Sequence, residues 1–196
     1  MHGPIAERNG ARLRHAVDDD LRAIDDLTVA CYGPIQASYV TMLGEECYEA
    51  VRLEPELTWQ ERKIGQNRRL FAAHREQVWV LDADGDVFGF VTFWLFPEQR
   101  YGHLDNNGVR ADRAGEGWAT FMYRHVLEHF RALGLRFAHV DTGLDDAHIP
   151  ARRAYEAVGF DRAVPGVEYW QDLSLRNAGS APDSAERLDD QGSRSK

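Results

Sequence analysis

A hairpin near the middle of the chain constrains the fold most. Two apolar runs, QVWVLDA at residues 77–83 and VFGFVTFWLF at residues 87–96, flank an Asp84-Gly85 pair. Asp-Gly favours the left-handed backbone of a tight two-residue turn. The second run is rich in β-branched and aromatic residues, as central strands are, and it ends at Pro97. The sequence therefore predicts a β-sheet built around this hairpin.

Strands and helices alternate on both sides of the hairpin. Further strands are expected at residues 11–17, 101–109, 136–142 and 167–173. Helices are expected at residues 18–33, in pieces across 36–75 with breaks near Gly44 and Pro55, at 117–133 and at 150–158. The strand, helix and strand from about 101 to 141 should form a parallel crossover. The fold class that follows is α/β, with a central mixed, mostly antiparallel sheet flanked by helices.

The first long helix carries clear start and stop signals. Asp18 or Asp19 is expected to cap it, and Gly33 with Pro34 is expected to end it. At the level of domains, we expect a flexible N-terminus at residues 1–10, one folded domain at 11–175 and a disordered tail at 176–196, where the sequence is polar and small.

Composition excludes several classes of function. The net charge of -9 argues against a nucleic-acid binder, which usually carries an excess of positive charge. No apolar run reaches the roughly 20 residues of a membrane helix, and the N-terminus has no apolar segment of the secretory kind. Cys31 and Cys47 are too few for a zinc ribbon. A cytoplasmic protein with free thiols is expected.

A glycine-rich loop lies between a predicted strand and a predicted helix. It reads AGEGWA, with Gly115 and Gly117 one residue apart. Glycines at a helix N-terminus let backbone N–H groups approach a phosphate, although a plain tight turn explains the same letters. The third glycine of a dinucleotide-binding fingerprint is absent, and Phe121 stands in that region.

Two other motifs favour ordinary structure over a metal site. HVLEH places His125 and His129 four residues apart with Glu128 between them, which matches one class of metalloprotease motif. No downstream helix offers a clear acidic ligand, so a polar helix edge is the better interpretation. DADGD resembles the start of a calcium loop, but Val87 stands where a glycine belongs. No metal is therefore expected.

Two blocks together resemble the cofactor-binding core of the GNAT family of N-acetyltransferases. In VRADRAGEGWATFM, Gly117 and Ala119 match the last two fixed positions of the family loop, and Gly115 matches a common glycine. In HIPARRAYEAVGF, the matching residues are Ala151, Tyr155, Gly159 and Phe160. VPGVEYWQDL resembles the closing strands. The resemblance implies the acetyltransferase fold, a splayed sheet in which NNG at residues 106–108 is a bulge.

The resemblance also implies acetyl-coenzyme A as cosubstrate. The residues expected to bind it are Val109, Arg113, Ala114, Gly115, Gly117, Trp118, Ala119 and His148. Two departures concern this site. Ala114 replaces an Arg or Gln, with Glu116 adding a negative charge nearby, while Arg113 is placed to compensate. His148 replaces the usual Asn.

The implied reaction is acetyl transfer to an amine. The candidate bases are His103 and Asp105, with His103 favoured because an unperturbed imidazole titrates near pH 6.5. The Val109 N–H is expected to stabilise the oxyanion, and Tyr155 to protonate the departing thiolate. The expected acceptor is a small-molecule or peptide amine, with no nucleic acid and no membrane as partner, and a homodimer is one expected assembly. A non-catalytic coenzyme A-binding or regulatory module is the alternative, motivated by Ala114 and Glu116.

Overall fold

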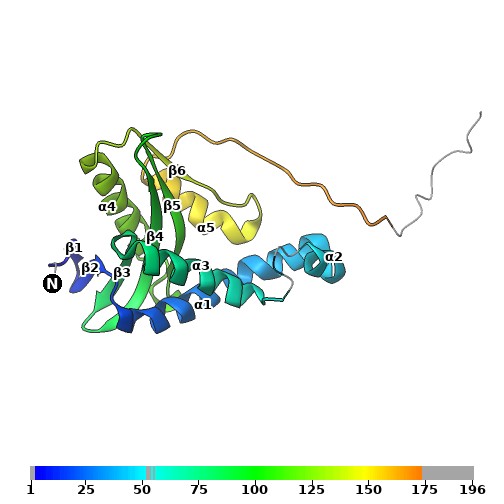
Figure 1. Ribbon diagram of the computed structural model, residues 1–196, viewed down its shortest axis with the longest axis horizontal. Coiled ribbons are helices and arrows are strands. Elements are labelled where there is room, and N and C mark those ends of the chain that lie inside the picture. The colour runs from blue at the N-terminus through cyan, green and yellow to red at the C-terminus, as the bar shows by residue number, and fades with distance from the viewer. Residues whose placement is uncertain (1–2, 52–53, 55, 174–196) are drawn as a thin grey trace, which may run out of the picture. The chain divides into compact units, whose positions relative to one another are not determined.

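The computed structural model describes residues 3–51, 54 and 56–173 (Figure 1). The described residues up to Gly166 form one compact unit, and a second unit begins at Val167. The tail expected at 176–196 and the helix break expected at Pro55 lie outside the described residues.

Within the described residues, six strands form one sheet in chain order. They are β1 (Ala6–Arg8), β2 (Ala11–His15), β3 (Val78–Ala83), β4 (Asp86–Phe96), β5 (Tyr101–Val109) and β6 (Phe137–Val140). Each neighbouring pair is antiparallel except β5 and β6, which are parallel. Asp84 and Gly85 make the predicted turn with φ of 53° and 89°. The mixed α/β fold class is confirmed.

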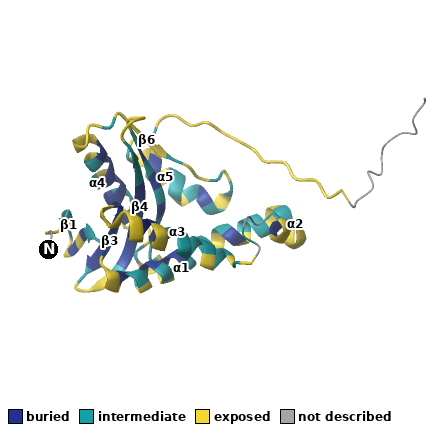
Figure 2. Cartoon of the chain, viewed as in Figure 1, coloured by how far each residue is buried: buried dark blue, intermediate teal, exposed yellow. Residues whose placement is uncertain are grey.

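Helices cover both faces of this sheet (Figure 1). They are α1 (Leu21–Leu43), α2 (Glu45–Ala50), α3 (Trp59–Ala73), α4 (Trp118–Ala132) and α5 (Ile149–Ala157). Residues alternate along β3, so Val78 and Val80 pack with α1 and α3, whereas Trp79 and Leu81 pack with α4. Both faces of the central strands are therefore buried (Figure 2).

A β-bulge in β5 determines which way its second half faces. Val91 pairs with Asn107 and Phe93 with Leu104, so Thr92 alone lies opposite Asp105 and Asn106. The bulge that NNG predicts is present, shifted one residue toward the N-terminus. Before it, a Cβ at Gly102 would meet Phe130 of α4, whereas after it a Cβ at Gly108 would meet Cys31 of α1. Because of the extra residue, even-numbered residues of β5 face α4 before the bulge and α1 after it.

Residues 6–8 correct the expectation of a loose N-terminus. They form β1, which pairs with β2 across a turn at Asn9 and Gly10, where φ is 49° and 78°. Asn-Gly is as strong a hairpin signal as Asp-Gly, so this strand was predictable from the sequence. Backbone pairing holds a segment whose side chains alone look polar.

The start and end expected for the first helix are wrong. Residues 18–20 form a 3₁₀ turn, and Asp20, not Asp18 or Asp19, accepts the Val17 N–H at 2.8 Å. Pro34 lies inside α1, which continues to Leu43. An interior proline costs about 3 kcal/mol, and tertiary contacts of the second half offset this cost. Gln36 is buried there, and Ser38 donates to Asp145 at 2.7 Å.

The last strand expected, at 167–173, is also absent. Residues 161–172 carry no regular secondary structure, and Tyr169 and Leu173 are 91% and 86% exposed. A β-prone composition forms a strand only when another strand supplies hydrogen bonds. Residues 167–173 are assigned no strand.

Two glycine substitutions test this packing with opposite expected signs. In Gly102→Ala, the new Cβ would lie 2.5 Å from the Phe130 ring, so we expect a loss of about 1–3 kcal/mol in the free energy of unfolding. Gly65→Ala adds a methyl group inside α3, where the nearest atom is the flexible end of the Arg69 side chain at 3.2 Å, and should stabilise by about 0.5–1 kcal/mol. Urea denaturation measures both, and equal stabilities would contradict the packing described.

Candidate active site

The loop between β5 and α4 has the shape of an anion cradle. Gly115 and Gly117 have φ of 79° and 77°, in the left-handed region that glycine tolerates best. A Cβ built on Gly115 would meet no heavy atom within 4 Å, so that side of the loop is open. The two glycines of the motif are thus required by the backbone conformation, and one of them borders free space.

The amides of this loop are free to bind a ligand. Gly117 is the N-cap of α4, and no side chain caps the helix. From Gly115 onward, the first backbone N–H that donates to a carbonyl in the described chain is that of Phe121, which bonds Gly117 at 3.0 Å. The N–H groups of residues 115–120 therefore lack acceptors there, and the helix dipole adds partial positive charge. This arrangement fits the diphosphate of coenzyme A.

Arg8 of β1 supports the loop, although no sequence motif singles it out. Its guanidinium donates to the carbonyls of Glu116 at 2.7 Å and Gly117 at 3.1 Å, and it lies 4.7 Å from the centre of the Trp118 ring. These bonds orient the carbonyls toward Arg8. Only the Asn9-Gly10 turn signal, by predicting β1, could have indicated this contact.

The other residues expected at the cofactor site differ in which of their groups remain available to bind a ligand. Trp118 is 3% exposed, and its indole donates to Glu116 at 2.7 Å, so only its backbone N–H remains for a ligand. That bond also engages the carboxylate of Glu116. Arg113 lies over the Phe88 ring at 5.2 Å. Ala114 ends the short 3₁₀ turn before the loop, and Ala119 lies in the first turn of α4.

Strands β5 and β6 diverge beside this loop. They pair only between Tyr101 and Leu104 of β5 and between Phe137 and Val140 of β6. The rest of β5, from the bulge to Val109, lies outside this pairing. Val109, the expected oxyanion donor, is therefore on the strand segment that the splay leaves open. The divergence implied by the resemblance is observed.

His103, one candidate base, lies between two polar neighbours before the bulge. It pairs in register with His139 of β6, and their Nδ1 atoms are 3.1 Å apart. Its Nε2 is 3.2 Å from a carboxylate oxygen of Asp141. Burial lowers the pKa of His103, while Asp141 opposes that shift. A carboxylate can only accept, so the proton of a neutral His103 belongs on Nε2 and the lone pair on Nδ1.

Among the described residues, the side chains of His103, His139 and Asp141 lie close enough together to hold a metal ion. We assign them no metal, and the expectation that none is needed stays a prediction. Asp105, the other candidate base, accepts the Trp94 indole N–H at 3.2 Å.

Tyr155, the candidate acid, is buried on α5 and 6% exposed. Its hydroxyl oxygen accepts an N–H from the Asn107 amide at 3.2 Å. Burial raises the pKa of Tyr155, and the hydrogen bond from Asn107 lowers it. Tyr155 therefore carries its proton at neutral pH, as an acid must.

His148, at the start of α5, connects this helix to α1. Its Nδ1 forms an ion pair with the Asp145 carboxylate, which also accepts from Ser38 of α1 at 2.7 Å. Arg152 donates to the carbonyls of Gly143 and Asp145 at 2.6 and 2.9 Å. In this chain His148 and Arg152 therefore order the loop before α5. We assign neither side chain to binding a cofactor phosphate.

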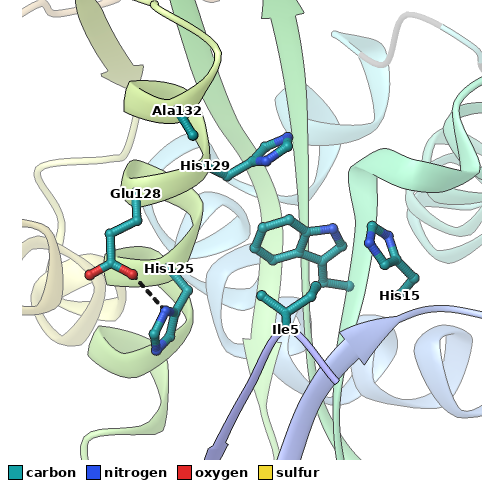
Figure 3. A pocket seen from close by; sticks show the side chains of 7 residues that line it. Ile5, His15, His125, Glu128, His129 and Ala132 are labelled. Carbon is teal, nitrogen blue, oxygen red and sulfur yellow. Dashed lines mark ion pairs between the residues drawn. The ribbon is translucent and has the colours of Figure 1, made fainter. Parts of the chain in front are cut away.

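The polar residues of HVLEH line a pocket on the α4 side of the sheet, together with Ile5 and His15 (Figure 3). His125 pairs with Glu128 at 2.8 Å, whereas His129 points the other way and packs 5.4 Å from the Trp79 ring. The two imidazoles do not converge. This pocket is separate from the residues that the resemblance implies.

Comparison with known proteins identifies the family. The profile of the acetyltransferase (GNAT) family matches residues 44–160, more than half of the 196 residues. The chain belongs to the GNAT acetyltransferase family. No curated protein matches the chain at a significant level. Within the described residues, no helix is both long and apolar enough to cross a membrane.

Several solved structures, acetyltransferases among them, share the fold at low identity. The ribosomal-protein-S18-alanine N-acetyltransferase of Escherichia coli is 15% identical, with a TM-score of 0.54 over 85% of this chain and 87% of that one. A GNAT acetyltransferase of Colwellia psychrerythraea is 16% identical, with a TM-score of 0.53 over 75% and 44%. A transcriptional regulator of Bacillus halodurans is 14% identical, with a TM-score of 0.54 over 82% and 99%. These likenesses concern the fold alone.

Two glycine-to-aspartate variants test the loop. Gly115→Asp and Gly134→Asp carry the same positive-φ strain and add a side chain in open space, at opposite ends of α4. Only Gly115→Asp places a carboxylate beside the free amides, so we expect its affinity for coenzyme A to fall about tenfold or more, a change of about 1.4 kcal/mol. Calorimetry measures the affinity. Equal losses in both variants would remove the loop from the binding site.

Proposed function

We propose that this chain transfers an acetyl group from acetyl-coenzyme A to the amine of a small-molecule or peptide acceptor. The observation that carries the proposal is that three features meet at β5. They are the splay of β5 from β6, the loop of free amides that follows β5, and buried Tyr155, which contacts β5 beside its bulge. The free thiols of Cys31 and Cys47 are consistent with a reducing cytoplasm. The expected homodimer stays a prediction.

We assign cofactor binding to backbone groups first. The amides of residues 115–119 would hold the diphosphate, and Arg8 would support the loop from its carbonyl side. Bound acetyl-coenzyme A supplies an activated thioester. This assignment explains how the loop could bind the diphosphate although Ala114 replaces the Arg or Gln of the family motif. The loop needs no cation at that position if its N–H groups and the helix dipole bind the anion.

We assign the base to His103. A protonated amine has no lone pair for attack, so a neutral base must accept its proton, directly or through water. The lowered pKa of His103 keeps it neutral at physiological pH, and Asp141 holds its tautomer. His139 is exposed on β6 with its Nδ1 3.1 Å from that of His103, so its ring must turn aside for the amine or a water to reach the His103 lone pair.

The pH dependence of turnover distinguishes the two candidate bases. With His103 as base, the acidic limb of kcat/KM reports its pKa, because only neutral imidazole accepts a proton. His103→Gln should lose that limb and about 100-fold or more in rate. Asp141 stabilises the imidazolium, so Asp141→Asn should move the limb to lower pH. A limb that disappears in Asp105→Asn, and persists in His103→Gln, would assign the base to Asp105 instead.

Tyr155→Phe tests the acid. The variant keeps the buried ring and removes the hydroxyl, so folding and coenzyme A binding should persist. Turnover at saturating acetyl-coenzyme A should fall by about 10²–10⁴-fold if proton delivery limits the rate. Stopped assays of released thiol measure turnover, and a thermal melt controls for folding. A variant within about twofold of wild type would leave Tyr155 with a packing role only.

One experiment separates the proposed enzyme from a non-catalytic coenzyme A-binding module. Purified protein is incubated with acetyl-coenzyme A and a pool of cell metabolites and peptides, and mass spectrometry detects new acetyl-amines. Calorimetry with coenzyme A runs in parallel. Transfer to an amine supports the enzyme, whereas binding without transfer to any amine supports the module.

A further inference from the structure

Two neighbouring asparagines connect the bulge of β5 to helices on both faces of the sheet. Asn106 accepts bonds from Tyr32 of α1 and Lys63 of α3, each at 2.9 Å. Asn107 interacts with Tyr123 of α4 and Tyr155 of α5. Successive side chains of a strand point to opposite faces, and the one-residue bulge decides that Asn106 faces α1 and α3 while Asn107 faces α4 and α5. The Asn107 side of this arrangement has no role in the mechanism so far.

The hydrogen bonds of Asn107 determine how its amide is oriented. Its Nδ2 donates to the Asp105 carbonyl at 3.0 Å, and a carbonyl can only accept. Its Oδ1 must then face Tyr123, whose hydroxyl donates to it at 2.5 Å. The second Nδ2 hydrogen points at the Tyr155 oxygen, 3.2 Å away. Both amide ends are therefore engaged, and neither can exchange places with the other.

This orientation decides which acceptor remains for the Tyr155 hydroxyl hydrogen. Because the Tyr155 oxygen accepts from Asn107, and because Asn107 Oδ1 is already taken by Tyr123, that hydrogen is not donated to Asn107. The acceptor beside it in this cluster is the Tyr123 hydroxyl oxygen, with which Tyr155 interacts. The ring itself cannot turn away: Tyr155 is 6% exposed and packs 5.1 Å from the Tyr123 ring. The hydroxyl hydrogen beside Tyr123 is the one that a general acid must deliver.

We propose that Tyr123 and Asn107 are positioning residues, which hold the Tyr155 oxygen in place so that its hydroxyl can turn from Tyr123 toward the departing sulfur. The inference rests on the proposed function, because it assigns a purpose to the acid of that reaction. Tyr123 holds the amide, the amide holds the Tyr155 oxygen, and neither positioning residue needs to touch substrate.

The proton balance of the step explains why a donor is useful there. As the carbon–sulfur bond breaks, its electron pair goes to sulfur, and the Tyr155 hydroxyl hydrogen goes to the same sulfur to give the free thiol. The Tyr155 oxygen is left as a phenolate, which the Asn107 N–H stabilises. The phenolate regains a proton from water as products leave, which balances the proton released to solvent from the amine.

Charged and polar groups around Tyr155 agree with this role. Burial raises the pKa of Tyr155 most, hydrogen bonds with Asn107 and Tyr123 lower it, and Asp141 and Asp105 add a smaller upward shift. Without the two positioning residues, Tyr155 would be a weaker acid, with its hydroxyl free to rotate toward other acceptors.

A double-mutant cycle tests the proposal with Tyr123→Phe and Tyr155→Phe. Tyr123→Phe should lower kcat by about tenfold or more, as small errors of position do, with the KM for acetyl-coenzyme A within about twofold of wild type. In the Tyr155→Phe background, the same change should lower kcat no further, because Tyr123 acts only through Tyr155. Equal losses in both backgrounds would indicate a merely structural role and overturn the proposal, as would an unchanged kcat in the single variant.

Tyr48→Phe is the matched control. It also removes a buried hydroxyl that donates to a side-chain amide oxygen, that of Gln36 at 2.7 Å, on α1 and α2 away from the bulge. It should lower the melting temperature by a similar amount and leave kcat within about twofold. A loss of kcat in this control equal to that in Tyr123→Phe would attribute the effect to general loosening.

A second measurement needs no turnover. Tyr155 is replaced with 3-fluorotyrosine, whose fluorine lowers the pKa of the phenol and reports its ionisation by ¹⁹F NMR in the free protein. The phenol should titrate at higher pH in Tyr123→Phe and in Asn107→Leu than in the wild-type background. An unchanged titration in both variants overturns the proposal. If no amine is acetylated but the titration shifts, the proposed function fails and the positioning of Tyr155 stands.

Discussion

The bulge at Asp105 and Asn106 is the constraint on which the rest of the site depends. With one extra residue opposite Thr92, β5 presents His103 on the face of α1 and α3 before the bulge, and Asn107 on the face of α4 and α5 after it. The parallel partner β6 accompanies β5 only up to Leu104. A single strand thus supplies the proposed base, the positioning amide and an open backbone edge within seven residues.

Contacts distant in the sequence hold this arrangement together. Arg8 from the first strand orients the loop between β5 and α4, and Tyr123 and Tyr155 from two helices meet at one amide. The pair Asp145–His148, tied to Ser38, connects α1 with the loop before α5. The contacts of Asn107 and Asp145 engage partly buried polar groups that would be costly to leave unpaired.

Prediction from the sequence succeeded where local rules apply and failed where tertiary contacts decide. The Asp84-Gly85 turn, the apolar β4 strand and the left-handed glycines of the loop all follow from backbone preferences of the residues themselves. The end of α1 did not, because contacts of its second half outweigh the cost of Pro34. The strand expected at 167–173 was wrong because composition cannot supply a pairing partner.

The sequence by itself determined the fold class, the family resemblance and the identity of Tyr155, Gly115 and Gly117 as candidates, because those features rest on local spacing and on backbone conformations that few residues adopt. Only the tertiary structure decided which groups meet: Arg8 with the loop, His139 and Asp141 with His103, and Tyr123 with Asn107. Such contacts join residues from 16 to more than 100 positions apart, and a one-residue bulge is enough to exchange the face on which they lie.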